Sequence, residues 1–184
     1  DKVAELMPGG GYYTRILAKT VGPKGHVYAL VPTGFAKRPG GLDALNALAA
    51  QYGNVTIVAT DLASFKLDTP VDVVWTTENY HDFHNGPTAN IPGLNAAVFV
   101  ALKPGGVYFI EDHAAAAGAG TTTTSTLHRI DPAAVISEAQ AAGFKLAGQS
   151  KLLANPADTH DKAVFDPSIR GETDKLALRF KKPG

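Results

Sequence analysis

The sequence predicts an α/β domain built on a mostly parallel β-sheet with helices on both faces. Apolar runs rich in Val, Ile, Tyr and Leu alternate with helix-like stretches from residue 2 to residue 111. Strands that alternate with helices form parallel sheets, and the helices bury both faces of the sheet. Two strand-like runs near the C-terminal end follow each other without a helix, which predicts an antiparallel pair at the sheet edge.

Five short buried strands are predicted first, with helices between them. Each helical stretch carries apolar residues at helical spacing and is closed by a Gly or a Pro. The predicted strands cover residues 2–7, 26–31, 54–59, 71–76 and 106–111, and the predicted helices cover residues 13–20, 42–52 and 95–102.

After the fifth strand the order of elements changes. Asp131 and Pro132 have the residue types of a helix N-cap and first turn, so they predict a helix over 133–142, and Gly143 ends it. Arg129 is expected to pair with Asp131 where this helix begins. The last two strands are predicted over 144–153 and 174–181. The connections 114–130 and 154–173 are unusually long, and the first is either a lid or a plain insertion.

Composition limits the classes of function. The chain has 184 residues and 19.2 kDa, which fits one domain over residues 1–184. Lys and Arg number 17, as do Asp and Glu, and a net charge of zero disfavours nucleic-acid partners. No apolar run approaches the roughly 20 residues that cross a bilayer, so no membrane insertion is predicted. The absence of Cys excludes disulfides and thiolate metal sites.

The chain starts directly at its first predicted strand, with no preceding helix and no Met. We therefore expect that an N-terminal segment precedes Asp1 in the natural protein. An export signal in that segment would place the protein in the periplasm. The oligomeric state is left open by the sequence.

Three glycines stand between the first strand and the first helix, at Gly9, Gly10 and Gly11. Glycines at such a turn let the backbone approach a ligand and present amide donors at the start of a helix. Glu5, near the end of the strand, suits a ligand ammonium or hydroxyl group. Asp61, after the third strand, suits an adenine amino group or caps the segment that follows. The alternative for the glycines is a tight strand-to-helix turn with no ligand.

Together these residues and the Leu102–Gly106 segment resemble the class I S-adenosylmethionine-dependent methyltransferases, over essentially the whole chain. Segments 9–14, 78–84, 126–131 and 155–158 are similar to a bacterial family of predicted methyltransferases. The resemblance implies a Rossmann-like three-layer sandwich with a seven-stranded sheet of order 3-2-1-4-5-7-6 and strand 7 antiparallel. It implies S-adenosylmethionine as cofactor and hence a cytoplasmic location. The cofactor-binding residues it implies are Glu5, Gly9, Gly10, Gly11, Tyr13, Thr14, Val31, Asp61, Leu62 and Glu78.

The chain departs from the pattern of these methyltransferases at two places. Met7 and Pro8 stand at the start of the glycine-rich motif, where the family has its first glycine. Residues 28–32, at the end of the second strand, contain no acid, although the family holds the two ribose hydroxyls with one there. Loss of one such hydrogen bond costs roughly 1–3 kcal/mol.

Histidines and carboxylates gather at the predicted ends of the fourth and fifth strands, where open α/β sheets bind ligands. His81, His84, Glu111 and His113 lie there, with His128 across the long loop. One reading makes His81, or else His113, a general base, because imidazole titrates near neutrality. A second makes His81, His84, Glu111 and His113 the ligands of a zinc or iron ion. The third is a solvated cleft whose histidines only bond to backbone.

The sequence therefore predicts an enzyme that transfers a methyl group from S-adenosylmethionine to an oxygen or nitrogen of a small molecule. His81, His113, Glu111 and His84 are the catalytic candidates in its acceptor site. The alternative is a protein with this fold but without the cofactor, which uses the histidine cluster to bind a metal or to catalyse another reaction.

Overall fold

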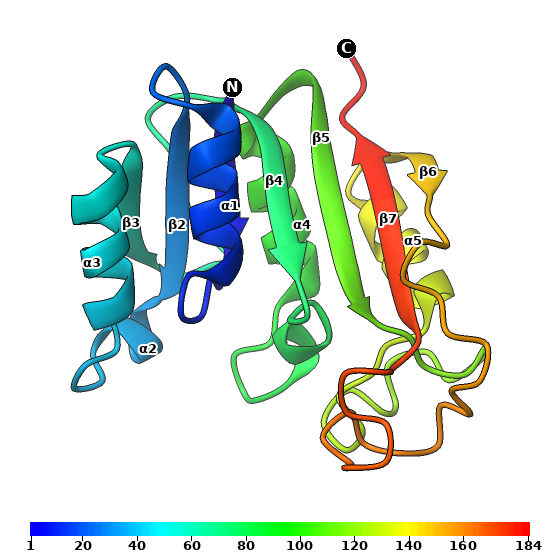
Figure 1. Ribbon diagram of the computed structural model, residues 1–184. Helices are drawn as coiled ribbons and strands as arrows, with labels where there is room; N and C mark the ends of the chain where they lie inside the picture. The colour runs from blue at the N-terminus through cyan, green and yellow to red at the C-terminus, as the bar shows by residue number, and fades with distance from the viewer.

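A seven-stranded sheet runs through the molecule in the order β3-β2-β1-β4-β5-β7-β6 (Figure 1). The computed structural model describes residues 1–184. Strands β1 to β5 pair in parallel, and β7 is antiparallel to both β5 and β6. The predicted fold class, strand order and antiparallel strand are confirmed. The strands are β1 Lys2–Leu6, β2 His26–Pro32, β3 Val55–Thr60, β4 Val71–Thr77, β5 Leu102–His113, β6 Lys145–Gln149 and β7 Lys175–Lys181.

Helices lie on both faces of this sheet. Figure 1 shows α1 and α3 in front of the sheet, and α4 and α5 behind it. The helices are α1 Tyr12–Val21, α2 Thr33–Ala36, α3 Asp43–Tyr52, α4 Ile91–Ala101 and α5 Pro132–Ala141, with a 3₁₀ helix, η1, over His81–His84. No helix combines the length and the hydropathy that a bilayer-spanning segment requires.

Three element bounds differ from the predicted ones by four residues, and the other differences are one or two residues. Helix α4 begins four residues earlier than predicted, because the side chain of Asn90 accepts a hydrogen bond from the Gly93 amide and a proline occupies the first turn. Strand β5 already begins at Leu102, since Leu102 pairs with Val71. Strand β6 stops at Gln149, where the predicted strand continued to residue 153.

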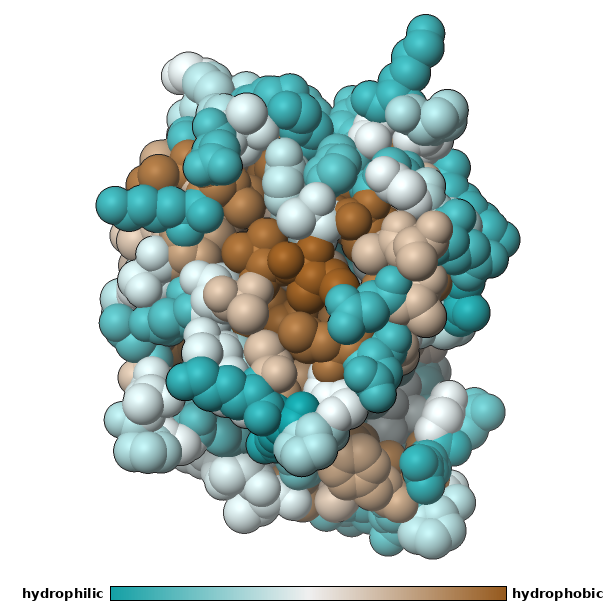
Figure 2. Space-filling view, turned by 90° about the vertical axis from the view of Figure 1, so that its left-hand side faces the viewer, coloured by the Kyte–Doolittle hydropathy of each residue, from teal (hydrophilic) through white to brown (hydrophobic).

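Alternate residues of the central strands face the two helical layers. Ala4 and Leu6 are buried in the larger apolar cluster, which includes residues of α4 and α5, whereas Val3 packs with Leu17 of α1. Figure 2 looks at the side of the molecule formed by β3 and α3 and shows apolar residues gathered in its middle. Burial of both faces therefore fixes the sheet and leaves its carboxyl-end loops free to form a site.

The two long connections form one packed unit at that end. Arg129 is fully buried and makes a two-pronged ion pair with Asp158, with Nη1–Oδ2 and Nη2–Oδ1 distances of 2.8 and 3.1 Å. Its guanidinium group also donates to the carbonyl groups of Ala114 and Lys162, both at 2.9 Å. The expected pairing of Arg129 with Asp131 is wrong, since Asp131 caps α5 by accepting from the Ala133 amide.

Replacing Arg129 by Met should lower the free energy of unfolding by roughly 3–5 kcal/mol, because Asp158 would stay buried without its partner. Urea unfolding measures the loss. The matched control is Arg170→Met in the same connection, where the side chain is exposed and the expected change is within about 0.5 kcal/mol. Equal losses in the two variants would show that the pair does not hold the loops.

Candidate functional site

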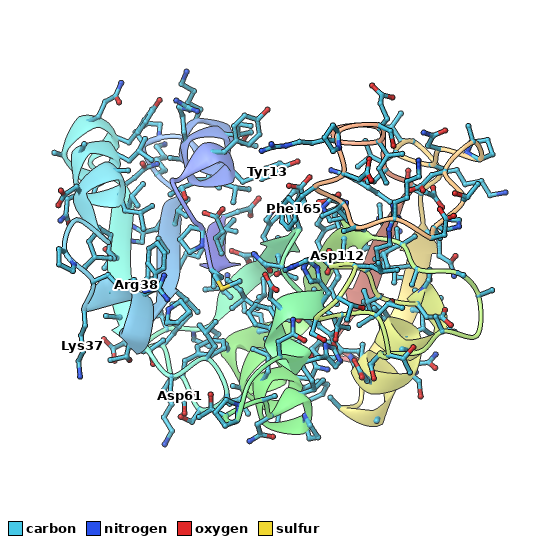
Figure 3. The ribbon with its side chains drawn as sticks, turned by 90° about the horizontal axis from the view of Figure 1, so that it is seen from below. Tyr13, Lys37, Arg38, Asp61, Asp112 and Phe165 are labelled. Atoms are coloured by element: carbon cyan, nitrogen blue, oxygen red, sulfur yellow. The ribbon has the colours of Figure 1, made fainter.

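The loops after β1, β4 and β5 meet at the carboxyl ends of the strands, as the sequence predicts. Asn79 connects the first two, because its side-chain Nδ2 donates to the carbonyl oxygens of Leu6 and Met7 at 3.2 and 3.1 Å. The amide of Glu78 donates to the carbonyl of Glu111 at 3.0 Å and so connects the last two. Figure 3 looks onto this end of the sheet.

The glycine turn has the backbone that a ligand cradle requires. Gly11 is the N-cap of α1 in the left-handed region, with φ of 85°, and a Cβ atom there would lie 2.2 Å from Leu48 Cδ1. Gly9 and Gly10 instead face open space, since a Cβ atom on either would meet no atom within 4 Å. A tight turn alone explains Gly11, while the open backbone at Gly9 and Gly10 leaves room for a ligand.

A cavity of about 460 Å³ lies beside this turn, which is within the size range of small-molecule sites. Residues from the end of β2, the loop after β3 and η1 surround it, including Thr33, Gly34, Asp61, Leu62, Asp82 and Phe83. Met7 lines this cavity and also a small pocket next to it, which Gly9 and Val31 share. Of the ten cofactor-binding candidates, Asp61 and Leu62 therefore line the cavity, and Gly9 and Val31 line the small pocket, which shares Met7 and Pro32 with it.

Asp61 serves first as a local cap. Its Oδ1 accepts from the amide of Ala63 and its Oδ2 accepts from Ser64 Oγ, both at 3.0 Å. A carboxylate has about four lone-pair positions, so two remain for a ligand. The capping role and the ligand role that the sequence left open are compatible.

The remaining cofactor candidates lie toward α1 and β4. Glu5 is 2% exposed, and Thr14 Oγ1 donates to its Oε2 at 2.5 Å. Burial raises the pKa of Glu5 to about 7, against an ordinary value of 4.5. Tyr13 packs beside Trp75, with ring centroids 5.7 Å apart. The exposed Glu78 forms an ion pair with Lys175.

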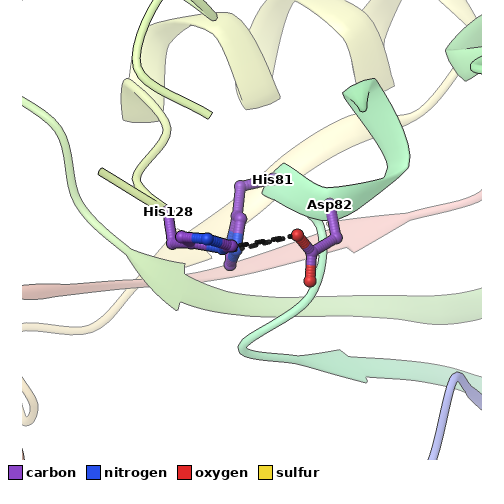
Figure 4. A group of neighbouring side chains, drawn as sticks. All are labelled: His81, Asp82 and His128. Carbon is purple, nitrogen blue, oxygen red and sulfur yellow. Dashed lines mark hydrogen bonds and ion pairs between the residues drawn. The ribbon is translucent and has the colours of Figure 1, made fainter. Parts of the chain in front are cut away.

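His81 stands at the centre of the histidine group. Its Nδ1 lies 2.7 Å from Asp112 Oδ1, and its own amide donates to Asp112 Oδ2 at 2.7 Å. Its Nε2 lies 3.2 Å from His128 Nδ1 and 3.3 Å from Asp82 Oδ1 (Figure 4). Burial lowers the pKa of His81, but hydrogen bonds with Asp112 and Asp82 outweigh burial and raise the pKa to about 9. His81 is therefore protonated at neutral pH.

The other two histidine candidates have different partners. The ring of His113 lies 6.2 Å from that of His81, and its Nδ1 bonds to Thr173 Oγ1 at 2.8 Å. Burial lowers the pKa of His113 to about 4, so this ring is neutral at neutral pH. His84 turns away from the group and bonds to Glu138 at 2.9 Å.

Glu111 is a buried carboxyl group with unsatisfied oxygens. It is 2% exposed, and neither of its side-chain oxygens has a hydrogen-bond partner. Lys175 Nζ lies 3.2 Å from Oε1, an ion-pair distance without hydrogen-bond geometry. Burial raises the pKa of Glu111 to about 7.

The structure thus brings the rings of His81 and His113 near each other, and His128 contacts His81. His84 and Glu111 do not contact this group, since His84 bonds to Glu138 and Glu111 lies next to Lys175. Asp82, Asp112 and Asn79 also make contacts at this end of the sheet, and none of the three was a candidate from the sequence. The alternation of β5 placed Asp112 on the face opposite Glu111, and that opposite face is where His81 lies. The alternation of side chains along β5 shows which face Asp112 points to, but it identifies His81 as the partner only once the position of η1 is known.

No family model and no curated protein sequence matches this chain. Several solved structures match it over its full length. The N-methyltransferase NodS of Bradyrhizobium japonicum WM9 aligns with a TM-score of 0.70, 15% identity, and 100% and 86% coverage of the two chains. The glycopeptide N-methyltransferase MtfA in complex with S-adenosyl-L-methionine aligns with a TM-score of 0.69 and 18% identity, over 100% of this chain and 82% of that one. The fold is that of these methyltransferases.

A third structure contains a putative methyltransferase in complex with the Haloferax volcanii Trm112 methyltransferase activator. It aligns with a TM-score of 0.71 at 18% identity, over 100% of this chain and 83% of that one. The fold of this chain, with its strand order, is therefore shared with the methyltransferase of this complex as well.

The buried Glu5 predicts a pH-dependent stability. Its pKa is higher in the folded state than its ordinary value, so the folded state binds the proton more tightly and loses stability as pH rises from about 4.5 to about 7. Glu5→Gln removes this loss. The stability of Glu5→Gln relative to wild type should be about 2 kcal/mol greater at pH 8 than at pH 5, measured by urea unfolding.

Thr14→Val provides the opposite change. The Thr14 hydroxyl lowers the pKa of Glu5, so removal of the hydroxyl should destabilise the protein more at pH 8 than at pH 5. Parallel pH profiles for wild type and Glu5→Gln would contradict the assignment.

Proposed function

We propose that the protein transfers a methyl group from S-adenosylmethionine to an oxygen or nitrogen of a small molecule. The observation that carries the proposal is the cavity of about 460 Å³ beside an open glycine turn, at the strand ends of a methyltransferase-type sheet. When bound, the cofactor supplies a sulfonium methyl group that is ready for transfer. The protein needs mainly to hold the acceptor in line with it.

The residues present fit the two ends of this cofactor. Asp61 and Leu62 on one side, with Thr33 and Gly34 on the other, offer an apolar wall and a carboxylate to an adenosine group. The open backbone of Gly9 and Gly10 and the carboxyl group of Glu5 suit the amino-acid end. Glu5 titrates near neutrality, so a cationic ammonium group would favour its ionised form.

The missing acid at the end of β2 has a partial substitute in this arrangement. Thr33 follows Pro32 directly and lines the cavity at that position, where its hydroxyl can exchange a hydrogen bond with ribose. One hydroxyl replaces the two acceptors of a carboxylate. We therefore infer that this chain binds the ribose more weakly than a chain with an acid at this position would.

The cofactor proposal predicts micromolar binding of S-adenosylhomocysteine, measured by calorimetry. Gly34→Leu should weaken it roughly 30-fold or more, because the new side chain occupies the cavity wall where a Cβ atom now meets open space. Lys37→Leu is the matched control. It adds the same side chain to an exposed position that does not line the cavity and should bind as wild type does. Absence of binding to wild type, or equal binding to Gly34→Leu, would refute the proposal.

The acceptor would lie next to the histidine group, because Asp82, Phe83 and Asn85 of the cavity wall belong to the same turn as His81. The charge states divide the catalytic candidates. The protonated His81 can donate to an acceptor but cannot take its proton, and His113 is a weak base with a pKa of about 4. Glu111 titrates near neutrality and neither of its oxygens has a hydrogen bond, although Lys175 Nζ lies 3.2 Å from Oε1. It lies on the face of β5 opposite Asp112 and His81, so an acceptor that it deprotonates must extend past the end of β5. We assign the proton-accepting role to Glu111.

Glu111→Gln should lower kcat roughly 100-fold or more for an acceptor that must lose a proton, while binding of S-adenosylhomocysteine stays unchanged. Release of S-adenosylhomocysteine with a panel of phenols and amines measures the rate. The rise of kcat/KM with pH near 7 should disappear in the same variant. The exposed Glu172→Gln is the control and should retain the wild-type profile. A pH profile that survives in Glu111→Gln would assign the base elsewhere.

A further inference from the structure

Three potential metal-ligand atoms meet at one point beside the cavity, and they come from two different segments. His81 Nε2 and Asp82 Oδ1 belong to η1 and lie 3.3 Å apart, while His128 Nδ1 comes from the long connection after β5. His128 Nδ1 lies 3.2 Å from His81 Nε2 and 3.5 Å from Asp82 Oδ1. The three atoms form a nearly equilateral triangle (Figure 4).

This triangle has the dimensions of one face of a coordination tetrahedron. Bonds of about 2.1 Å from nitrogen or oxygen to a tetrahedral zinc ion separate the ligand atoms by about 3.4 Å. The three observed separations of 3.2, 3.3 and 3.5 Å surround that value. Two imidazoles and one carboxylate on a single face leave the other positions of an ion open, as in catalytic zinc and non-haem iron sites.

The surroundings of His81 also match those of a metal-ligating histidine. Such a ring usually donates its second nitrogen to a carboxylate, which fixes the tautomer and the ring orientation. Asp112, fully buried, lies 2.7 Å from His81 Nδ1 and so directs Nε2 toward the other two atoms. A bound ion would displace the Nε2 proton to solvent, while Nδ1 keeps its proton toward Asp112. The ring of His128 is oriented by Phe165, whose centroid lies 4.9 Å away in an edge-on contact.

The backbone of His128 supports a specific role for this side chain. It has φ of 55°, in the left-handed region that costs a residue other than glycine roughly 1–2 kcal/mol. Strain of this kind persists where the surrounding structure holds it, and it often marks functional positions. Here it places Nδ1 of His128 against a turn 47 residues earlier in the chain.

We propose that His81, Asp82 and His128 bind one divalent transition-metal ion of the zinc type, with Asp112 as the positioning residue of His81. The ligand set differs from the histidine and glutamate set that the sequence offers as one of three readings, since His84 and Glu111 have other partners. Asp82 lines the cavity, so an oxygen or nitrogen atom of a molecule in the cavity would be within reach of the open positions. The site does not depend on methyl transfer.

The test measures zinc binding to the full chain without an affinity tag, by calorimetry and by elemental analysis after dialysis. We expect one Zn²⁺ per chain with a dissociation constant in the micromolar range or tighter. His128→Ala and Asp82→Asn should each weaken binding at least 100-fold, and neither side chain is buried. Asp112→Asn should weaken it 10- to 100-fold, as loss of an outer carboxylate does. Co²⁺ should give visible absorption bands that His128→Ala loses.

His26→Ala is the matched control, because His26 lies in β2 and bonds to Thr56, away from the triangle. It should bind Zn²⁺ as wild type does. Wild type that binds no zinc, or zinc binding that is equal in wild type, His128→Ala and Asp82→Asn, would overturn the proposal and leave a hydrogen-bonded His81–His128 pair. Binding of S-adenosylhomocysteine, measured separately, shows whether the cofactor proposal stands or fails independently.

Discussion

The buried carboxylate of Asp112 holds the carboxyl end of the sheet together. It has no exposed surface and accepts three hydrogen bonds, from the amide of His81, the ring of His81 and the amide of His113, at 2.7, 2.7 and 2.8 Å. A buried carboxylate is tolerated only when its oxygens are satisfied in this way. Because two of the donors belong to η1 and one to β5, the carboxylate sets the distance between the loop after β4 and the end of β5.

The long connections form the outer wall of the same region. Arg129 is adjacent in sequence to His128, so the buried pair of Arg129 with Asp158 fixes the backbone that carries the His128 ring. Asp158 in turn accepts from the amide of Asp174, one residue before β7. These bonds attach the two long connections to the sheet. The attachment explains how two segments without helices or strands can hold side chains at defined distances.

Much of the fold is predictable from the sequence because it depends on local patterns. Apolar runs bounded by Gly and Pro gave strands whose bounds lie within a few residues of those observed, and the Asp131 cap began α5 where expected. The strand order came from the resemblance rather than from periodicity. Contacts between loops could not be predicted. Arg129, for example, pairs with Asp158, 29 residues away in the sequence, and not with the nearer Asp131. Such pairings depend on which loops the finished sheet brings together.

The candidate site was predictable to a different degree at its two ends. The glycine turn and Asp61 follow strands directly, so their place at the sheet edge comes from the strand pattern alone. The histidine group required knowledge of η1, whose turn sends His81 toward Asp112 and His84 toward Glu138 although the two are three residues apart. Spacing in sequence does not decide this, since His81 bonds to the buried Asp112 of β5 and His84 bonds to the half-buried Glu138 of α5.

The backbone shows where side-chain identity outweighs local conformational preference. Four residues other than glycine have positive φ, and three of them, Met7, Glu78 and His128, belong to the site. Met7 stands where the methyltransferases that the chain resembles have a glycine, and it takes the left-handed conformation that glycine would adopt without strain. Its side chain lines both the main cavity and the small pocket beside it. The turn thus takes the left-handed conformation at a residue other than glycine and places a large apolar side chain against both spaces. The side-chain identity at this position therefore contributes to the lining of the cavity, at the cost of a conformation that glycine adopts more easily.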